Sequence, residues 1–274
     1  MNLQNITPAE RLIRKDRAIT IAGLTALSLL SWVWIMAGAG LGMNTLSMST
    51  FQFPPPVMDG TVMAWSPGYA VLMLAMWWIM MIAMMIPSAA PMILLYGRVA
   101  RHAQNNGQMK QRRLPTFVFV LGYLAVWLCF SAVATGTQWG LERAGLVHQM
   151  LMWSTSTTLT CLLLIAAGLY QLTPLKHACL EHCRSPVGYL SSHWLNGRSG
   201  AFTMGLTHGA YCLGCCWLLM ALLFACGVMN LVWIAGLAIV VLIEKVAPWG
   251  ASFSQTLAAI MVGAGVWLLL QGAV

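Results

Sequence analysis

The chain has 274 residues, of which 59% are hydrophobic and 7% are charged, with a mean hydropathy of +0.77 and a formal net charge of +8. Soluble globular domains carry roughly 25% charged residues, so this composition excludes an ordinary soluble protein and predicts an all-α helical bundle in a lipid bilayer. The positive charge implies no nucleic-acid partner, because basic loop residues are what set the orientation of a membrane protein.

Apolar stretches recur along the whole chain, and crossing a bilayer takes about 20 such residues, so we predict about seven transmembrane helices. We expect one integral membrane domain, residues 1–274, without a separate soluble domain. The predicted spans are residues 18–39, 69–98, 114–140, 156–175, 201–227, 231–249 and 253–271.

The basic residues predict the orientation of these spans. Of the 14 Lys and Arg residues, Arg143 alone falls on one side of the predicted bundle. Basic residues remain in the cytoplasm, so we expect a multi-pass protein of the bacterial cytoplasmic membrane with its N-terminus inside and its C-terminus outside. None of the 8 cysteines falls in a predicted external loop, and we expect reduced thiols.

Methionine is concentrated in the second predicted span and in the external loop before it. In the span, Met80 and Met84 lie one helical turn apart, on the same face as Met73 and Met76. A methionine stripe is usually ordinary packing, but thioethers also bind Cu(I) without losing a proton. The loop methionines, which we interpret as a capture loop for the ion, are Met43, Met48, Met58 and Met63.

The loop after the fourth predicted span contains the sequence KHACLEHC, residues 176–183. In a helix, Cys179 and Cys183 lie one turn apart, with His182 beside them. Two thiols and an imidazole on the cytoplasmic side predict a docking site for a soft metal. The alternative is a basic juxtamembrane helix with incidental cysteines.

The fifth predicted span contains the sequence THGAYCLGCCW, residues 207–217. His208, Cys212 and Cys215 share one helix face, with Met204 one turn earlier and Cys216 at the edge of that face. Thiolate and thioether ligands favour Cu(I) over zinc, and an ionisable histidine inside a span is usually functional. The alternative is that these cysteines are small packing residues.

Glu244 and Lys245 lie next to each other in the last turns of the sixth predicted span. We interpret them as an interfacial ion pair in which Lys245 extends toward the headgroups. The alternative is that Glu244 is a counter-charge for a passing cation.

Three blocks of the sequence resemble one bacterial family, known as predicted metal-binding integral membrane proteins of unknown function. They are MMIAMMIPSAAPMI (residues 80–93), YQLTPLKHACLEHCRSP (170–186) and GLTHGAYCLGCCWLLMALLFACGVMNLVWIA (205–235). The resemblance implies metal binding, with His208, Cys212, Cys215, Cys216, Cys179, His182 and Cys183 at motif positions.

These observations predict a membrane protein that binds Cu(I) and either transports it or delivers it to a membrane metalloenzyme, in exchange with a cytosolic copper carrier. We expect no enzymatic activity, because the sequence contains no phosphate-binding glycine loop, paired carboxylates or nucleophile elbow. Two alternatives remain open: a thiol–disulfide electron conduit, and a structural or assembly subunit. The oligomeric state does not follow from the sequence.

Overall fold

The computed structural model describes residues 8–42, 45, 49, 53, 64–105, 115–150 and 152–272. The regular elements of this part of the chain are all helices, which confirms the all-α class. The helices are α1 (Pro8–Met36), α3 (Pro67–Asn105), α4 (Pro115–Arg143), α5 (Thr157–Gln171), α6 (Pro174–Arg184), α7 (Pro186–Ser192), α8 (Gly197–Ala221), α9 (Leu223–Cys226), α10 (Leu231–Val246) and α11 (Gly250–Gly272).

Proline marks the start of many of these helices. Its fixed φ suits the first helical position, where the missing N–H would have no partner inside the helix. A side-chain cap accompanies the proline at α6, where Thr173 accepts a hydrogen bond from the backbone N–H of Lys176. The helices that begin with proline are α1, α3, α4, α6 and α7.

Five helices are long and apolar enough to cross a membrane, or six if the pair α5 and α6, bent by 64°, counts as one broken span. Every predicted span contains a helix, but α10 has only 16 residues. A helix of that length reaches about 24 Å, which is less than a hydrocarbon core of about 30 Å. The count of seven spans and their orientation therefore stay predictions.

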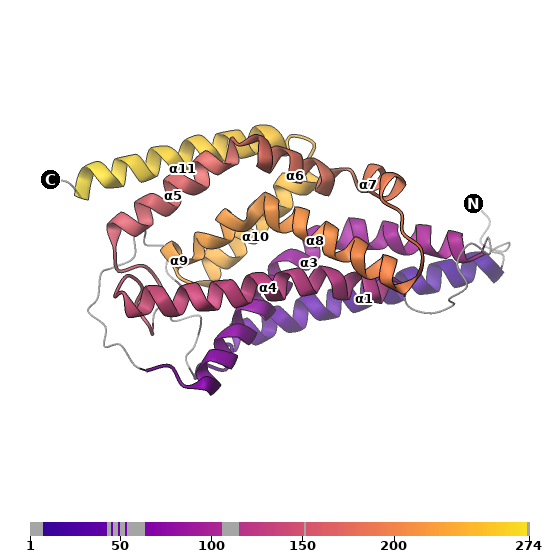
Figure 1. Cartoon of the computed structure of the whole chain (residues 1–274), viewed down its shortest axis with the longest axis horizontal. Coiled ribbons are helices and arrows are strands. Elements are labelled where there is room, and N and C mark those ends of the chain that lie inside the picture. The colour runs from indigo at the N-terminus through magenta and orange to yellow at the C-terminus, as the bar shows by residue number, and fades with distance from the viewer. Residues whose placement is uncertain are drawn as a thin grey trace.

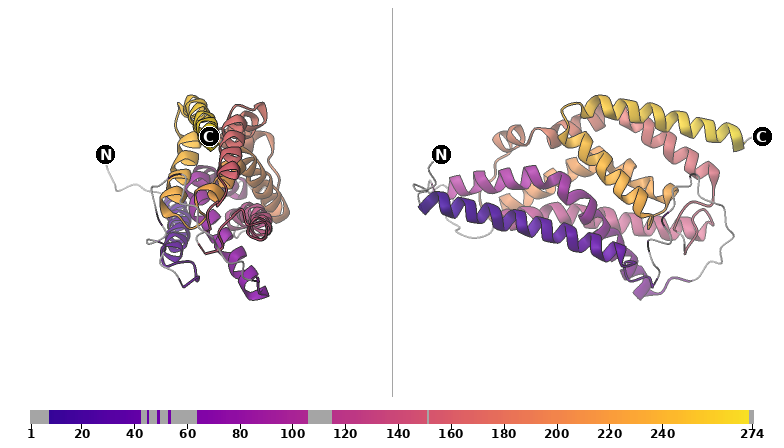
Figure 2. Two further views of the ribbon diagram at one scale, coloured as in Figure 1. Left: turned by 90° about the vertical axis from the view of Figure 1, so that its left-hand side faces the viewer. Right: turned by 180° about the vertical axis from the view of Figure 1, so that it is seen from behind.

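Helix α1 begins at the end of the molecule where α3 ends and α4 and α8 begin, whereas α11 ends at the opposite end (Figure 1). The pair formed by α5 and α11 lies on the side of the bundle opposite α1 (Figure 2). Helix α3, which carries the methionine stripe, is packed between α1, α4 and α10.

Glycine brings α4 and α8 into close contact. A Cβ atom on Gly205 of α8 would collide with the backbone of Phe119, and one on Gly122 of α4 would collide with the backbone of Phe202. Small residues let membrane helices approach until their backbones touch. This contact fixes the rotation of α8, and with it the direction in which His208 and Cys212 point.

Candidate metal site

Helix α6 lies against α8, so the two cysteine-containing segments are neighbours (Figure 1). The bend between α5 and α6 returns the chain toward the bundle. Gly214 leaves room for the approach, because a Cβ atom there would lie 2.8 Å from Sγ of Cys179. The hydroxyl of Tyr170 donates to the carbonyl of the same glycine over 2.5 Å, which fixes the end of α5 to α8.

The thiols of α6 and α8 form one group. The side chain of Cys183 interacts with those of Cys212 and Cys215, and Cys216 interacts with the same two thiols. Cys179 lies near Cys215. We call Cys183, Cys212, Cys215 and Cys216 the thiol cluster. The sequence presented the α6 and α8 cysteines as two separate sites, and the fold joins them.

Weak hydrogen bonds hold the thiol cluster in its present arrangement. Sγ of Cys215 and Sγ of Cys216 each donate to the carbonyl oxygen of Cys212, over 3.0 Å in both cases. Among the described residues, no group of three or more His, Cys, Asp or Glu side chains is arranged to hold a metal ion. Thiols are weak donors, so a metal–sulfur bond could replace these contacts after small side-chain rotations.

His208 is buried one turn before Cys212, with 3% of its surface exposed. Its Nδ1 atom has no hydrogen-bond partner in the described part of the chain. The rings of Phe119, Tyr123 and Tyr189 surround it, with centroids about 6 Å from that of the imidazole. A buried polar atom without a partner is costly, so Nδ1 is available to bind a ligand.

Lys245 extends into the bundle and meets Cys212. Its Nζ atom donates to Sγ of Cys212 over 2.9 Å and to Oγ of Ser88 over 3.3 Å. The hydroxyl of Tyr123 lies 3.1 Å from the same sulfur. Cys212 is therefore in contact with Lys245 of α10 and with Tyr123 of α4, as well as with its own helix.

The interfacial ion pair expected between Glu244 and Lys245 is wrong. Glu244 instead pairs with Lys176 over 2.8 Å, and each side chain is only 1% exposed. Gln171 donates to the same carboxylate over 3.0 Å. Neighbouring residues on a helix point in different directions, so Glu244 faces α6 while Lys245 faces α8.

Two of the candidate ligands have other partners. His182 stacks on Tyr211 with the ring centroids 4.1 Å apart, and its Nδ1 lies 2.8 Å from the carbonyl oxygen of Ala178. Sδ of Met204 accepts a hydrogen bond from the backbone N–H of Leu195 over 3.3 Å. Burial raises the pKa of Tyr189 to about 12, and its neutral hydroxyl donates to the Met204 carbonyl over 3.0 Å. Neither His182 nor Met204 joins the thiol cluster.

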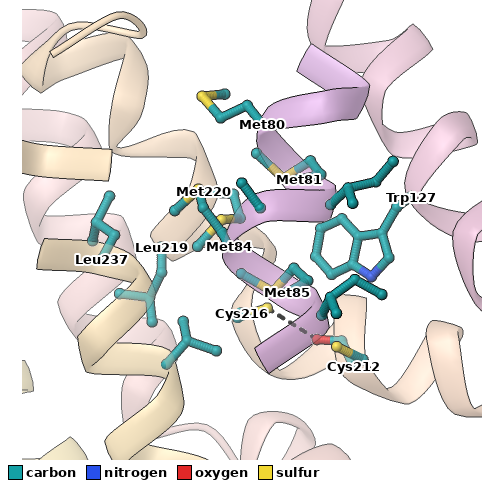
Figure 3. Packing of buried hydrophobic residues seen from close by; sticks show 14 of the residues in the cluster. Met80, Met81, Met84, Met85, Trp127, Cys212, Cys216, Leu219, Met220 and Leu237 are labelled. Carbon is teal, nitrogen blue, oxygen red and sulfur yellow. Dashed lines mark hydrogen bonds between the residues drawn. The ribbon is translucent and has the colours of Figure 1, made fainter. Parts of the chain in front are cut away.

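The methionines of α3 lead to the thiol cluster. Met80 and Met84 are 0% and 1% exposed, and Met80, Met81, Met84 and Met85 follow one another along α3 toward Cys212 and Cys216 (Figure 3). The Tyr123 hydroxyl also reaches the carbonyl oxygen of Met85, over 3.4 Å, which links this part of α3 to Cys212. The methionines of the predicted capture loop, Met43, Met48, Met58 and Met63, lie outside the described residues.

Sequence reasoning missed Lys245, Tyr123 and Ser88 as neighbours of the thiols. The signal for Lys245 was its place at the end of an apolar helix, since charged residues inside spans tend to serve function. Tyr123 and Ser88 gave no such signal, because their roles depend on how α3 and α4 pack against α8.

A family model described as a copper chaperone, PpoB2, matches residues 74–268. The chain belongs to this copper chaperone family. The matched region contains the thiol cluster, His208, Lys245 and the methionines from Met76 onward, whereas α1 precedes it. The membership supports the metal-related part of the resemblance seen in the sequence. No curated protein and no solved structure matches the chain.

Proposed function

We propose that this member of the copper chaperone family binds Cu(I) as its cargo at the thiol cluster and passes the ion to a partner protein. The observation that carries the proposal is the meeting of Cys183 from α6 with Cys212 and Cys215 from α8, next to an unpartnered His208. Thiolates and imidazole are ligands that Cu(I) accepts, and hard-cation ligands are scarce around them.

The methionines of α3 supply a second set of soft ligands. They are buried and follow one another toward the thiol cluster (Figure 3). An ion that exchanges between neighbouring sulfur atoms never enters the apolar interior bare, where the free-energy cost would be of order tens of kcal/mol. We propose that Met80 and Met84 conduct the ion between the outer side and the cluster.

Helix α6 is the part of the site that a soluble partner could reach. Cys179 and Cys183 are half-buried, whereas Cys212, Cys215 and Cys216 are buried. Exchange with a cytosolic copper carrier would therefore begin at α6, with His182 beside the two thiols. The receiving partner would be a membrane metalloenzyme. The chaperone itself would catalyse no reaction. It would reside in the cytoplasmic membrane of a bacterium.

The test is Cu(I) binding by the purified full-length protein under reducing, anaerobic conditions, with a chromophoric Cu(I) chelator as competitor. His208→Ala combined with Cys212→Ser should lose most of the bound copper. The control is Cys161→Ser, which makes the same chemical change in a buried cysteine of α5 outside the cluster. Copper retention by the double variant would rule out the site, and trapped mixed disulfides in place of copper would favour the electron conduit.

A further inference from the structure

In the part of the chain that the structure describes, no carboxylate pairs with Lys245. The opposite charges of Lys176 and Glu244 neutralise each other, and these two residues form the sole ion pair in the described part of the chain. Glu142, at the far end of α4, accepts hydrogen bonds from the side chains of Trp65 and Gln138. Lys245 is 7% exposed, and its hydrogen bonds to described residues go to the Cys212 sulfur and the Ser88 hydroxyl.

A buried ammonium group needs a nearby negative charge, because burying an isolated ion is costly. The Ser88 hydroxyl remains neutral, and Tyr123 is a phenol that hydrogen-bonds to Cys212. Of the groups in contact with Lys245, the Cys212 sulfur is the one that carries a negative charge when it binds a metal as thiolate. The lysine is thus placed beside the charge that metal binding produces.

We propose that Lys245 is the counter-ion of the metal–thiolate group and restricts the site to monovalent soft ions. This inference rests on the proposed function, in which Cys212 and a second thiolate hold the cargo. One Cu(I) and two thiolates carry a net single negative charge, which the ammonium of Lys245 neutralises. A divalent ion with the same thiolates is already neutral, and the ammonium then remains as an uncompensated charge in a medium of low dielectric constant.

The neighbouring residues hold Lys245 in position for this role. Glu244 is fixed by Lys176 and by Gln171, which itself accepts a hydrogen bond from Ser254 of α11 over 3.0 Å. The carboxylate therefore anchors α10 to α5, α6 and α11. Because Lys245 follows directly on the same helix, its side chain points about 100° away from that of Glu244 around the helix axis, toward Cys212.

The experiment compares Cu(I) and Cd(II) binding by the full-length protein in detergent, under anaerobic conditions. Cd(II)–thiolate absorption reports the divalent ion, and chelator competition reports Cu(I). Lys245→Met should weaken Cu(I) binding on the order of tenfold to a hundredfold, the range for a hydrogen bond to a charged group, without weakening Cd(II) binding. Lys245→Arg, which keeps the charge, should retain the preference for Cu(I).

The matched control removes a positive charge away from the cluster. Arg143, at the far end of α4, lies over the ring of Trp139 at 5.1 Å from its centroid, and Arg143→Met should leave the preference for Cu(I) unchanged. The inference would be overturned if Lys245→Met lowered the affinities for Cu(I) and Cd(II) equally, or if it lowered neither affinity. If wild-type protein binds no Cu(I) at the cluster, the proposed function itself fails, which is a different outcome.

A second measurement needs no variant. Ag(I) is monovalent and soft, so it should displace Cu(I) from the wild-type protein, whereas the same excess of Cd(II) should not. Displacement by Cd(II) as effective as displacement by Ag(I) would overturn the role of Lys245 even if Lys245→Met does not fold.

Discussion

The Nζ atom of Lys176 lies 2.8 Å from Oε2 of Glu244, and both side chains are 1% exposed. This pair connects α6, which carries Cys179 and Cys183, to α10, which carries Lys245. The relative placement of the two helices that contribute to the candidate metal site thus depends on a buried ion pair.

We expect Lys176→Met to lower the free energy of unfolding by about 3–5 kcal/mol, because the Glu244 carboxylate would be left buried without its cation. Thermal unfolding in detergent, followed by circular dichroism, measures the change. Lys176→Met with Glu244→Gln should recover much of the loss, since a pair of neutral side chains leaves no buried charge. If Lys176→Met alone were as stable as the wild type, α6 would be held in place by other contacts.

Gly205→Ala should lower stability by about 1–3 kcal/mol, because the added methyl group collides with the backbone of Phe119 and pushes α8 away from α4. The same displacement moves His208 and Cys212, so Cu(I) binding should weaken as well. Gly136→Ala is the control, since nothing lies within 4 Å of a Cβ atom at that position of α4. It should leave stability unchanged or slightly higher. Equal effects of the two substitutions would contradict close packing of α4 and α8.

A water-soluble maleimide should label Cys179 and Cys183 faster than Cys212, Cys215 and Cys216, because only the first two are partly exposed. Mass spectrometry of inverted membrane vesicles after short exposure measures this order. Added Cu(I) should protect Cys183, since this thiol already contacts Cys212 and Cys215. Unchanged labelling of Cys183 with and without Cu(I) would exclude it as a ligand.

The orientation predicted from the basic residues is tested by reporter fusions. A reporter active only outside the cytoplasm should be active after Val274, and one active only in the cytoplasm should be active after Ser185. If the fusion after Val274 reports a cytoplasmic location, the number of spans is even, and α10 or the broken pair of α5 and α6 does not cross the membrane.

The helical class, the positions of the long apolar helices and the candidate ligands within each helix could be predicted from the amino-acid sequence. These features depend on local properties: the length of each apolar run, the prolines that begin helices, and the spacing that places His208, Cys212 and Cys215 on one face. A helix forms its backbone hydrogen bonds within one segment, so the residues that share a helix face can be predicted without knowing which other helices pack against it.

Which helix faces meet, in contrast, became known from the packing of the helices. The bend after α5 brings α6 onto α8, so Cys183 reaches Cys212 and Cys215, whereas His182 stacks on Tyr211 instead. Lys245 turns inward to Cys212 because Glu244, its neighbour in the chain, is held by Lys176. These contacts join residues far apart in the sequence, and they follow from the close approach of helices and from the need of each buried charge for a partner.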